Sequence, residues 1–319
     1  MKLYRSRLTL RSASASHWQA DTIFGHLCWH IARWHDESRL NDLLEQCRRG
    51  KPPALLSDGF PRDYMPRPIL PRAGAPQHLS KADRVKHHFD VKFAGQSEWL
   101  TLEGFNQLRR GETMTSLLKE KDVELAAGSR SISKNQVDRR TNTAGGDGGK
   151  LFDFVETILP EVTIYWRIED DWEKTVGDFL EDLKASGYGK RKSVGYGQIE
   201  SFTFEEFHGL DETPPRANGF ISLSRFVPAP NDPTDGYWDI AVKYGKLGEE
   251  LAVSGRPFKR PLIQLECGSC FFDEVKPDWV NRWYGRLVDG VVTQDQEKLY
   301  GFEVKQYGFA FLVPMRIAL

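Results

Sequence analysis

The sequence predicts an α+β protein of two ferredoxin-like domains, the first over residues 1–205 and a degenerate second one over residues 206–319. The first domain has the order strand, helix, strand, helix, glycine-rich loop and strand, which is compatible with a βαββαβ unit. The second contains several strand-like runs and few long helical ones. A chain of 319 residues is long enough for two domains, or for one large domain with insertions.

Hydrophobic periodicity identifies the first elements. Residues 2–10 alternate as a strand does. A helix is expected over residues 21–35 with Asp21 as a plausible N-cap, and a second helix begins at Ser38 and is ended by a glycine. The proline-rich residues 52–76 should be extended and lie along the surface or form a sheet edge, because proline cannot donate a ladder hydrogen bond.

The later segments complete the two domains. Residues 81–149 form a long polar excursion, which in a compact domain is usually functional, the alternative being a flexible charged loop. Residues 171–185 predict an acidic helix, whose charged face would repel RNA and should point to solvent or to a protein partner. Strands are expected at residues 162–167, 198–204, 220–227, 238–244, 262–272 and 307–317.

Composition is that of an ordinary globular protein, with 39% hydrophobic and 28% charged residues. No apolar run approaches the roughly 18 residues of a membrane span, and residues 1–10 do not resemble a secretory leader, so we expect a cytoplasmic location and no membrane partner. The formal net charge of −1 argues against a nonspecific nucleic-acid binder. It is compatible with a protein that grips a short RNA segment locally.

Cysteines and histidines were weighed as catalytic or metal-binding groups. Cys267 and Cys270 form a single C-x-x-C inside an apolar stretch, which indicates buried thiols rather than a zinc or redox site. His26 and His30 share a helix face that we expect to be solvated, opposite the apolar face. We therefore expect no metal, no cofactor and no catalytic residue, although a ribonuclease could use such histidines as general acid and base.

Residues 186–197 concentrate the chemistry of the chain, with four glycines, three consecutive cations and two tyrosines. Glycine lets a ligand approach main-chain N–H groups, and consecutive N–H groups in turns form anion-binding concavities, so the expected ligand is a phosphate chain. The loop has neither Walker A nor dinucleotide spacing, and it runs from a helix to a strand. The alternative is a helix C-cap at Gly187 followed by a surface turn.

This loop resembles the glycine-rich signature of the RAMP proteins of CRISPR effector complexes, where it lies between the second helix and the last strand of a ferredoxin-like fold. Further motifs are similar to one family within them, the fourth subunits of type III-A (Csm) complexes. They follow in order along nearly the whole chain, at residues 21–29, 59–61, 64–68, 135–141, 148–152, 268–271 and 307–311.

The resemblance implies a non-catalytic RNA-binding subunit that caps the 5′ handle of CRISPR RNA in an antiviral type III-A ribonucleoprotein. It implies two protein partners, the large palm-domain subunit and the backbone RAMP subunit, and no small-molecule substrate. It also implies a β-hairpin thumb, inserted at about residues 80–150, that wedges against the guide RNA.

The candidate RNA-binding residues come from the loop and, through the resemblance, from the first helix N-terminus and the thumb. They are Gly187, Gly189, Lys190, Arg191, Lys192, Ser193, Gly195, Gly197, His17, Asp21, Thr22, Asn135, Arg139, Arg140 and Thr141. Amides around the glycines would cradle phosphates, and the three cations would neutralise them. Tyr188 and Tyr196 could stack on bases or pack back onto the fold.

Two rival functions stay open at this point. One is a metal-independent endoribonuclease that processes precursor CRISPR RNA with a histidine such as His17 or His26. The other is a nucleotide-binding enzyme that uses the glycine loop, against which the missing Walker spacing already counts.

Overall fold

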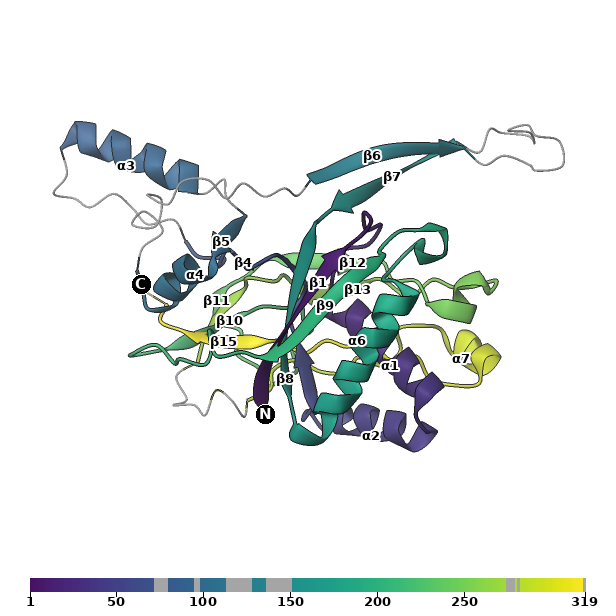
Figure 1. Cartoon of the computed structure of the whole chain (residues 1–319). Coiled ribbons are helices and arrows are strands. Elements are labelled where there is room, and N and C mark those ends of the chain that lie inside the picture. The colour runs from purple at the N-terminus through teal and green to yellow at the C-terminus, as the bar shows by residue number, and fades with distance from the viewer. Residues whose placement is uncertain are drawn as a thin grey trace.

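A computed structural model describes residues 1–71, 80–94, 98–112, 128–135, 151–273, 279 and 282–317. A five-stranded antiparallel sheet forms the centre of the first half (Figure 1). Its strand order is β2-β8-β1-β9, and β3 also pairs with β8. The strands are β1 (Lys2–Leu10), β2 (Ala54–Leu56), β3 (Phe60–Pro61), β8 (Glu161–Ile168) and β9 (Ile199–Glu206).

The long helices α1 (Ala20–Trp34) and α6 (Glu173–Ser186) pack together, and α6 also contacts β9. The helix α1 follows β1, and α6 joins β8 to β9 through a short 3-10 turn, η1 (Asp170–Trp172). The strand and helix order predicted for residues 1–205 is therefore present. The acidic face of α6 is exposed, as expected, at residues such as Asp178 and Glu181.

The central strand β8 is buried on both of its faces. Trp166 meets Phe179 of α6 at 6.2 Å between ring centroids. On the opposite face Tyr165 meets Phe207 at 5.4 Å, and the Arg167 guanidinium lies 5.4 Å from the ring centroid of Phe311. The second half of the chain thus covers the sheet face that the helices leave free.

Two predicted helix caps are wrong. The N-cap of α1 is Gln19 rather than Asp21, and the Ala20 amide donates to the Asp58 carboxylate at 2.8 Å. The helix α2 (Glu37–Arg48) is capped by Asp36 rather than Ser38. The reason is that Asp36 has extended backbone angles and accepts a 2.9 Å hydrogen bond from the Arg39 amide.

The proline-rich segment lies at the edge of the sheet, which is one of the two positions predicted for it. However, it is buried. Residues Ala54–Leu56 and Phe60 are inaccessible to solvent. The cover comes from the second half, since the Leu56 amide donates to the Tyr307 hydroxyl at 3.3 Å. Beyond it, β4 (Tyr64–Pro66) pairs with β5 (Trp99–Thr101), which leads into α4 (Leu102–Arg109).

The long polar excursion contains regular structure. Residues 85–93, whose sequence is partly alternating, belong to the helix α3 (Lys81–Ala94). The strands β6 (Gly128–Asn135) and β7 (Leu151–Ile158) pair antiparallel along eight residues each and project from the body of the molecule (Figure 1). The implied hairpin is thus present, and its second strand lies beyond residue 150.

The second half is built mainly of strands. One sheet has the order β11-β14-β10-β15, and a separate pair is formed by β12 and β13. These strands are β10 (Gly219–Ser222), β11 (Gly236–Tyr237), β12 (Ile240–Lys243), β13 (Leu262–Leu265), β14 (Cys270–Phe272) and β15 (Leu312–Met315). The helical elements described here are short, namely η3 (Glu249–Val253) and α7 (Gln294–Tyr300).

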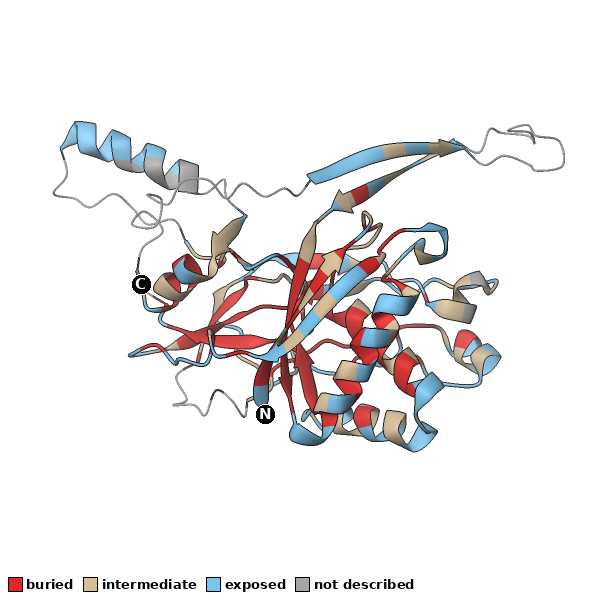
Figure 2. Cartoon of the chain, viewed as in Figure 1, coloured by how far each residue is buried: buried red, intermediate tan, exposed pale blue. Residues whose placement is uncertain are grey.

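One hydrophobic core joins the two halves (Figure 2). The same buried cluster contains Leu8 and Trp166 from the first half and Phe309 and Met315 from the second. Within the described segments no group of three or more metal-ligating side chains gathers, and burial raises the pKa of Cys270. No described helix combines the length and the apolarity that crossing a membrane requires.

Candidate nucleic-acid interface

The glycine loop between α6 and β9 is closed at its base by backbone hydrogen bonds. Gly187 (φ +77°) ends α6 and donates to the Leu183 carbonyl at 2.8 Å, while the Tyr188 amide donates to the Gly197 carbonyl at 2.9 Å. A Cβ at Gly197 (φ +62°) would overlap the carbonyl oxygen of Tyr188. Glycine is therefore required at Gly197 both for its φ and for the close approach of the two chain ends.

Tyr188 packs onto the fold, which decides between the two alternatives for this residue. Its ring is fully buried and stacks on Trp18, with centroids 3.8 Å apart and planes 11° apart. The hydroxyl donates to the His17 carbonyl at 2.8 Å and accepts from the Gln19 amide at 3.2 Å. This ring is not available to a base.

The amides of the four loop glycines are all donated to protein acceptors, so they do not form the expected cradle themselves. Gly189 donates to Nε2 of His26 at 3.3 Å, Gly195 to the Lys192 carbonyl at 3.2 Å, and Gly197 to the Ala13 carbonyl at 2.9 Å. The Lys190 amide is also taken, by the Ser16 hydroxyl at 2.9 Å. The glycines shape the loop rather than contact a ligand.

The histidines of α1 face the loop and α6 rather than solvent, contrary to the sequence-based expectation. Burial, followed by nearby Lys192, lowers the pKa of His26 to about 4, so its ring is neutral at pH 7 and can accept from Gly189. His30 is buried, with Nδ1 3.1 Å from a carboxylate oxygen of Asp182 on α6. The apolar pattern alone did not reveal that α6 covers this side.

Three consecutive amides remain without a partner among the described residues, those of Arg191, Lys192 and Ser193. Arg191 has the left-handed conformation (φ +62°, ψ +20°), and residues Lys192–Val194 continue as the 3-10 turn η2. Consecutive N–H groups that follow such a reversal converge into an anion-binding concavity. The candidate phosphate site is therefore formed by these three amides.

The three loop cations have three different surroundings. Lys190 is exposed. The Arg191 guanidinium lies 4.7 Å and 4.5 Å from the ring centroids of Phe152 and Phe154 on β7. Lys192 turns inward and pairs with Glu249 at 2.6 Å, so its charge is already partly compensated by the protein. Of these three cations, Lys190 and Arg191 are the two that are placed to contact a phosphate.

The loop and the hairpin meet in a group that we call the aromatic-cation cluster: Lys134, Phe152, Phe154, Arg191 and Tyr196. In the β6–β7 register Lys134 lies opposite Phe152, which puts both side chains on one face. The Lys134 ammonium is 4.6 Å from the Tyr196 ring centroid, and Phe154 meets Tyr196 edge-on at 5.4 Å. Sequence reasoning missed Lys134, Phe152 and Phe154, although alternation over residues 151–155 could have indicated this strand.

The opposite face of the hairpin is exposed and partly apolar. Leu151 and Val155 are 67% and 60% accessible, and Asn135 at the end of β6 is also exposed. The root of β7 is fixed by two backbone hydrogen bonds between Ser14 and Thr157. Of the other candidate residues, Arg139, Arg140 and Thr141 lie outside the described part of the chain.

The N-terminus of α1 is closed by protein groups, which corrects the expectation of an open anion site. Asp21 is buried and its carboxylate bonds Lys243 and Gln306, the latter at 2.6 Å. Burial disfavours ionisation of Asp21, but Lys243 outweighs it and lowers the carboxyl pKa. Thr22 accepts from the same lysine at 2.8 Å. These side chains join the two halves and do not face a ligand.

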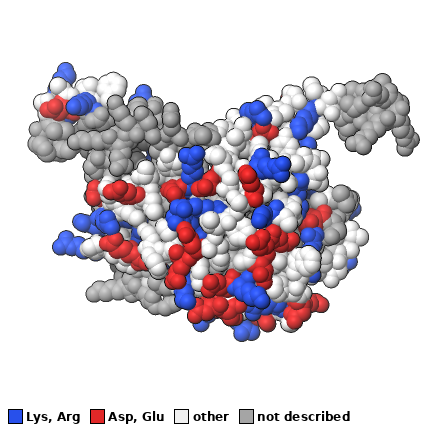
Figure 3. All heavy atoms as spheres, in the orientation of Figure 1, with Lys and Arg blue, Asp and Glu red and all other residues white. Residues whose placement is uncertain are grey.

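His17 is exposed at the same side of the molecule as the loop. Partial desolvation of the part of its ring that faces the protein, followed by the charges of Arg225 and Lys190, lowers the pKa of His17. The proximity of Lys190 places it next to the candidate phosphate site. Cationic and anionic side chains are interspersed over most of the face in Figure 3, in keeping with a local rather than a broad electrostatic footprint.

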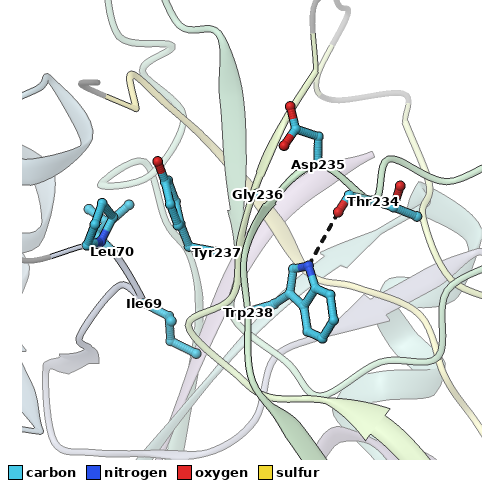
Figure 4. A pocket seen from close by; sticks show the side chains of 8 residues that line it. Ile69, Leu70, Thr234, Asp235, Gly236, Tyr237 and Trp238 are labelled. Atoms are coloured by element: carbon cyan, nitrogen blue, oxygen red, sulfur yellow. Dashed lines mark hydrogen bonds between the residues drawn. The ribbon is translucent and has the colours of Figure 1, made fainter.

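An open hollow of about 540 Å³ lies elsewhere, beside β11 (Figure 4). Leu70, Tyr237 and Trp238 line it, and the Trp238 indole donates to the Thr234 carbonyl at 3.3 Å. Among the described residues that line it, the only charged one is Asp235. A hollow with a carboxylate and no cation does not favour a phosphate-bearing nucleotide, so it gives no support to the nucleotide-binding alternative.

The sequence matches no family profile and no curated protein. Solved structures are similar over the whole chain. One, described as a Csm1–Csm4 cassette in complex with AMPPNP, has a TM-score of 0.61 at 15% identity and is covered completely in both directions. Another, described as a Csm3–Csm4 subcomplex in the type III-A CRISPR-Cas interference complex, has a TM-score of 0.62 at 12% identity, with 99% of this chain and 100% of that chain covered.

Csm4 is the component common to these descriptions. Identities this low establish similarity of fold alone. The motifs quoted from the sequence resemble those of the same subunit. Over its whole length, the chain therefore shares the fold found in these Csm4-containing complexes.

Proposed function

We propose that this chain is a non-catalytic subunit of a type III-A effector ribonucleoprotein and that it caps the 5′ handle of CRISPR RNA in antiviral defence. The observation that carries the proposal is the row of three free amides at residues 191–193, beside one exposed cation and one cation stacked on aromatic rings. Phosphate is the ligand that such a concavity suits.

In this proposal the loop binds the RNA backbone and the hairpin contacts the RNA bases. A phosphate oxygen would accept from the free amides, and Lys190 would neutralise its charge. The planar guanidinium of Arg191, held against Phe152 and Phe154, can donate to a second phosphate. Aromatic side chains of the hairpin would then support unstacked bases. Backbone contacts and base contacts are thus divided between two elements.

The proposed partners are the large palm-domain subunit and the backbone RAMP subunit, which the chain would bridge. The support is that structures with this fold are described as a Csm1–Csm4 cassette and a Csm3–Csm4 subcomplex. We also infer two ferredoxin-like domains, residues 1–205 and 206–319, from the strand order of the first half and the second antiparallel sheet. A cytoplasmic location accords with this role.

The endoribonuclease alternative is disfavoured by the histidine surroundings. His26 has a pKa near 4 and accepts from the Gly189 amide, so it is a poor general acid at neutral pH. His17 is the exposed histidine beside the loop, and the structure describes no carboxylate that pairs with it by a hydrogen bond. A cleavage assay with His17→Ala tests this alternative directly.

The test of the proposal is binding of labelled 5′-handle RNA across a salt series, with the chain alone or in complex with its partner subunits. For single-stranded nucleic acid, the logarithm of affinity falls by about 0.7 per neutralised phosphate per logarithmic unit of salt. Lys190→Ala should weaken binding and reduce that slope by about 0.7. Lys174→Ala, an exposed lysine on α6 with the same charge change, should alter neither.

The RNA should stay intact throughout. An unchanged salt slope in Lys190→Ala would show that the loop is a surface turn rather than a phosphate site. Cleavage of the RNA that is lost in His17→Ala would establish the endoribonuclease instead.

A further inference from the structure

Glu249, in the second half of the chain, is the anchor of the inward-turned loop lysine. One carboxylate oxygen lies 2.6 Å from the Lys192 ammonium, and the other lies 2.9 Å from the Arg33 guanidinium on α1. The side chains of Glu249 and Lys192 are only 13% and 22% accessible. This ion pair therefore lies mostly below the surface, where it is less screened than a surface pair.

The backbone at both ends of the pair is held in an unfavourable conformation. Glu249 has φ +52°, and Arg191, which precedes Lys192, has φ +62°. Left-handed angles are uncommon for residues with a side chain and persist where the surroundings over-determine them. Among the described residues only two other non-glycine positions, Arg62 and Arg216, have positive φ.

Lys192 is also fixed through its main chain. Its carbonyl accepts from the Gln198 side chain at 3.2 Å and from the Gly195 amide at 3.2 Å. The side chain and the carbonyl of Lys192 are thus both held by the protein, whereas the amides of residues 191–193 have no partner among the described residues. The ion pair fixes the side-chain direction of the middle residue of this row of amides.

We propose that Glu249 is a positioning residue for the phosphate-binding loop: it holds Lys192 turned inward, so that the three amides at residues 191–193 keep the converging arrangement that receives a phosphate. This inference rests on the proposed function, since it assigns a role within the same RNA site. In this inference Lys192 supports the structure of the loop and is not a phosphate ligand. The second half of the chain thus sets the geometry of the loop.

The opposite role would give opposite results. If Lys192 were the phosphate ligand and Glu249 its competitor in the free protein, removing the carboxylate would release the lysine and tighten RNA binding. If Glu249 positions the loop, removing it disorders the amides and weakens binding, while the number of phosphates neutralised stays the same.

The experiment compares Glu249→Gln, Lys192→Gln and the double variant in the salt-series assay with 5′-handle RNA. Each single variant should weaken binding about threefold to tenfold with an unchanged salt slope. The double variant should be no weaker than Glu249→Gln alone, because the ion pair that Lys192→Gln removes is already lost in Glu249→Gln. Glu181→Gln, which neutralises an exposed carboxylate on α6, is the matched control and should bind like the natural sequence.

A second measurement needs no RNA. Amide hydrogen exchange at residues 194–196, whose amides donate to the carbonyls of Arg191 and Lys192, should be faster in Glu249→Gln and Lys192→Gln than in the natural protein and the control. The melting temperature confirms that each variant is folded. Tighter binding by Glu249→Gln, a flatter salt slope in Lys192→Gln, or unchanged exchange in the loop would each overturn the inference. Faster exchange in a protein that fails to bind the RNA would support the positioning role and overturn the proposed function alone.

Discussion

The ring of Tyr188 stacks on the indole of Trp18 at 3.8 Å between centroids, which fixes the first turn of the glycine loop to the connection between β1 and α1. Two segments about 170 residues apart in the sequence are joined at this point, as the hydrogen bond from the Tyr188 hydroxyl to the His17 carbonyl also shows. The loop is therefore rooted in the core, and its free amides sit on a rigid base.

Tyr188→Phe should keep the stacked ring and lose only the hydroxyl. The His17 carbonyl would then lose the hydroxyl as donor, and the Gln19 amide would keep only the His17 carbonyl, at 3.1 Å, as acceptor. We therefore expect a loss of about 1 kcal/mol in the free energy of unfolding. Tyr188→Ala should cost about 3 to 5 kcal/mol, because it also opens a cavity against Trp18. Denaturant unfolding measures both values. Equal losses in the two variants would contradict the role given to the ring.

Gly197→Ala and Gly195→Ala form a matched pair. A Cβ at Gly197 overlaps the Tyr188 carbonyl, whereas one at Gly195 meets nothing within 4 Å, and both residues have positive φ. Gly195→Ala should cost only the backbone strain, about 1 to 2 kcal/mol. Gly197→Ala should cost clearly more and should disturb RNA binding as well, since the loop base must open. Thermal unfolding compares the two, and equal melting temperatures would refute the close approach.

Phe154→Ala should weaken the binding of 5′-handle RNA about tenfold, because it removes both a ring for base stacking and the surface on which Arg191 rests. Arg191→Ala should be partly redundant with it, so that the double variant loses less affinity than the sum of the two. Phe258→Ala, a 70% exposed phenylalanine in the second half, serves as the control and should have no effect. Additive losses would show that the two side chains act independently.

Asp58→Asn should raise stability at neutral pH and above. Burial raises the pKa of Asp58 to about 7, above the value of about 3.9 in an unfolded chain. The folded protein therefore binds more protons between these two values, and its stability falls as pH rises from about 4 to about 7. Asparagine keeps the acceptor for the Ala20 amide without the buried charge. The gain should approach about 4 kcal/mol at pH 8 and vanish near pH 4, as unfolding at several pH values would show.

Local patterns predicted much of the first half of the fold. Residues 2–10 alternate and form β1 with the same limits, and the glycine loop lies between α6 and β9 as its flanking periodicities indicated. Contacts between distant residues were not predictable in this way. The acceptor for the first amide of α1 is Asp58, and the partner of Lys192 is Glu249, each far away in the sequence. The apolar pattern of a helix shows one buried face, but it cannot show that a second element also covers the polar face. For this reason His30, which lies against α6, was predicted to be solvated.

The candidate site was predicted in part. The loop was located correctly between α6 and β9, but the amides of its glycines, which were predicted to help cradle phosphates, are donated to protein acceptors. The amides without a partner among the described residues are those of residues 191–193. Glycine in a sequence indicates unusual backbone angles. Whether a backbone amide is free can be seen only when every hydrogen-bond acceptor near it is known. The aromatic side chains of β7 were missed because the strand borders a long polar segment. Asp21 was misassigned because its buried partner, Lys243, lies in the second half.

The core that the two halves share limits how this protein can be divided. A fragment ending at residue 205 would expose the face of β8 that carries Tyr165 and Arg167, and would leave Asp21 without Lys243 and Gln306. Such a fragment would present a broad apolar surface to water and tend to aggregate. The halves would therefore unfold in one cooperative transition and would be lost or kept together in evolution, whatever the internal resemblance between them.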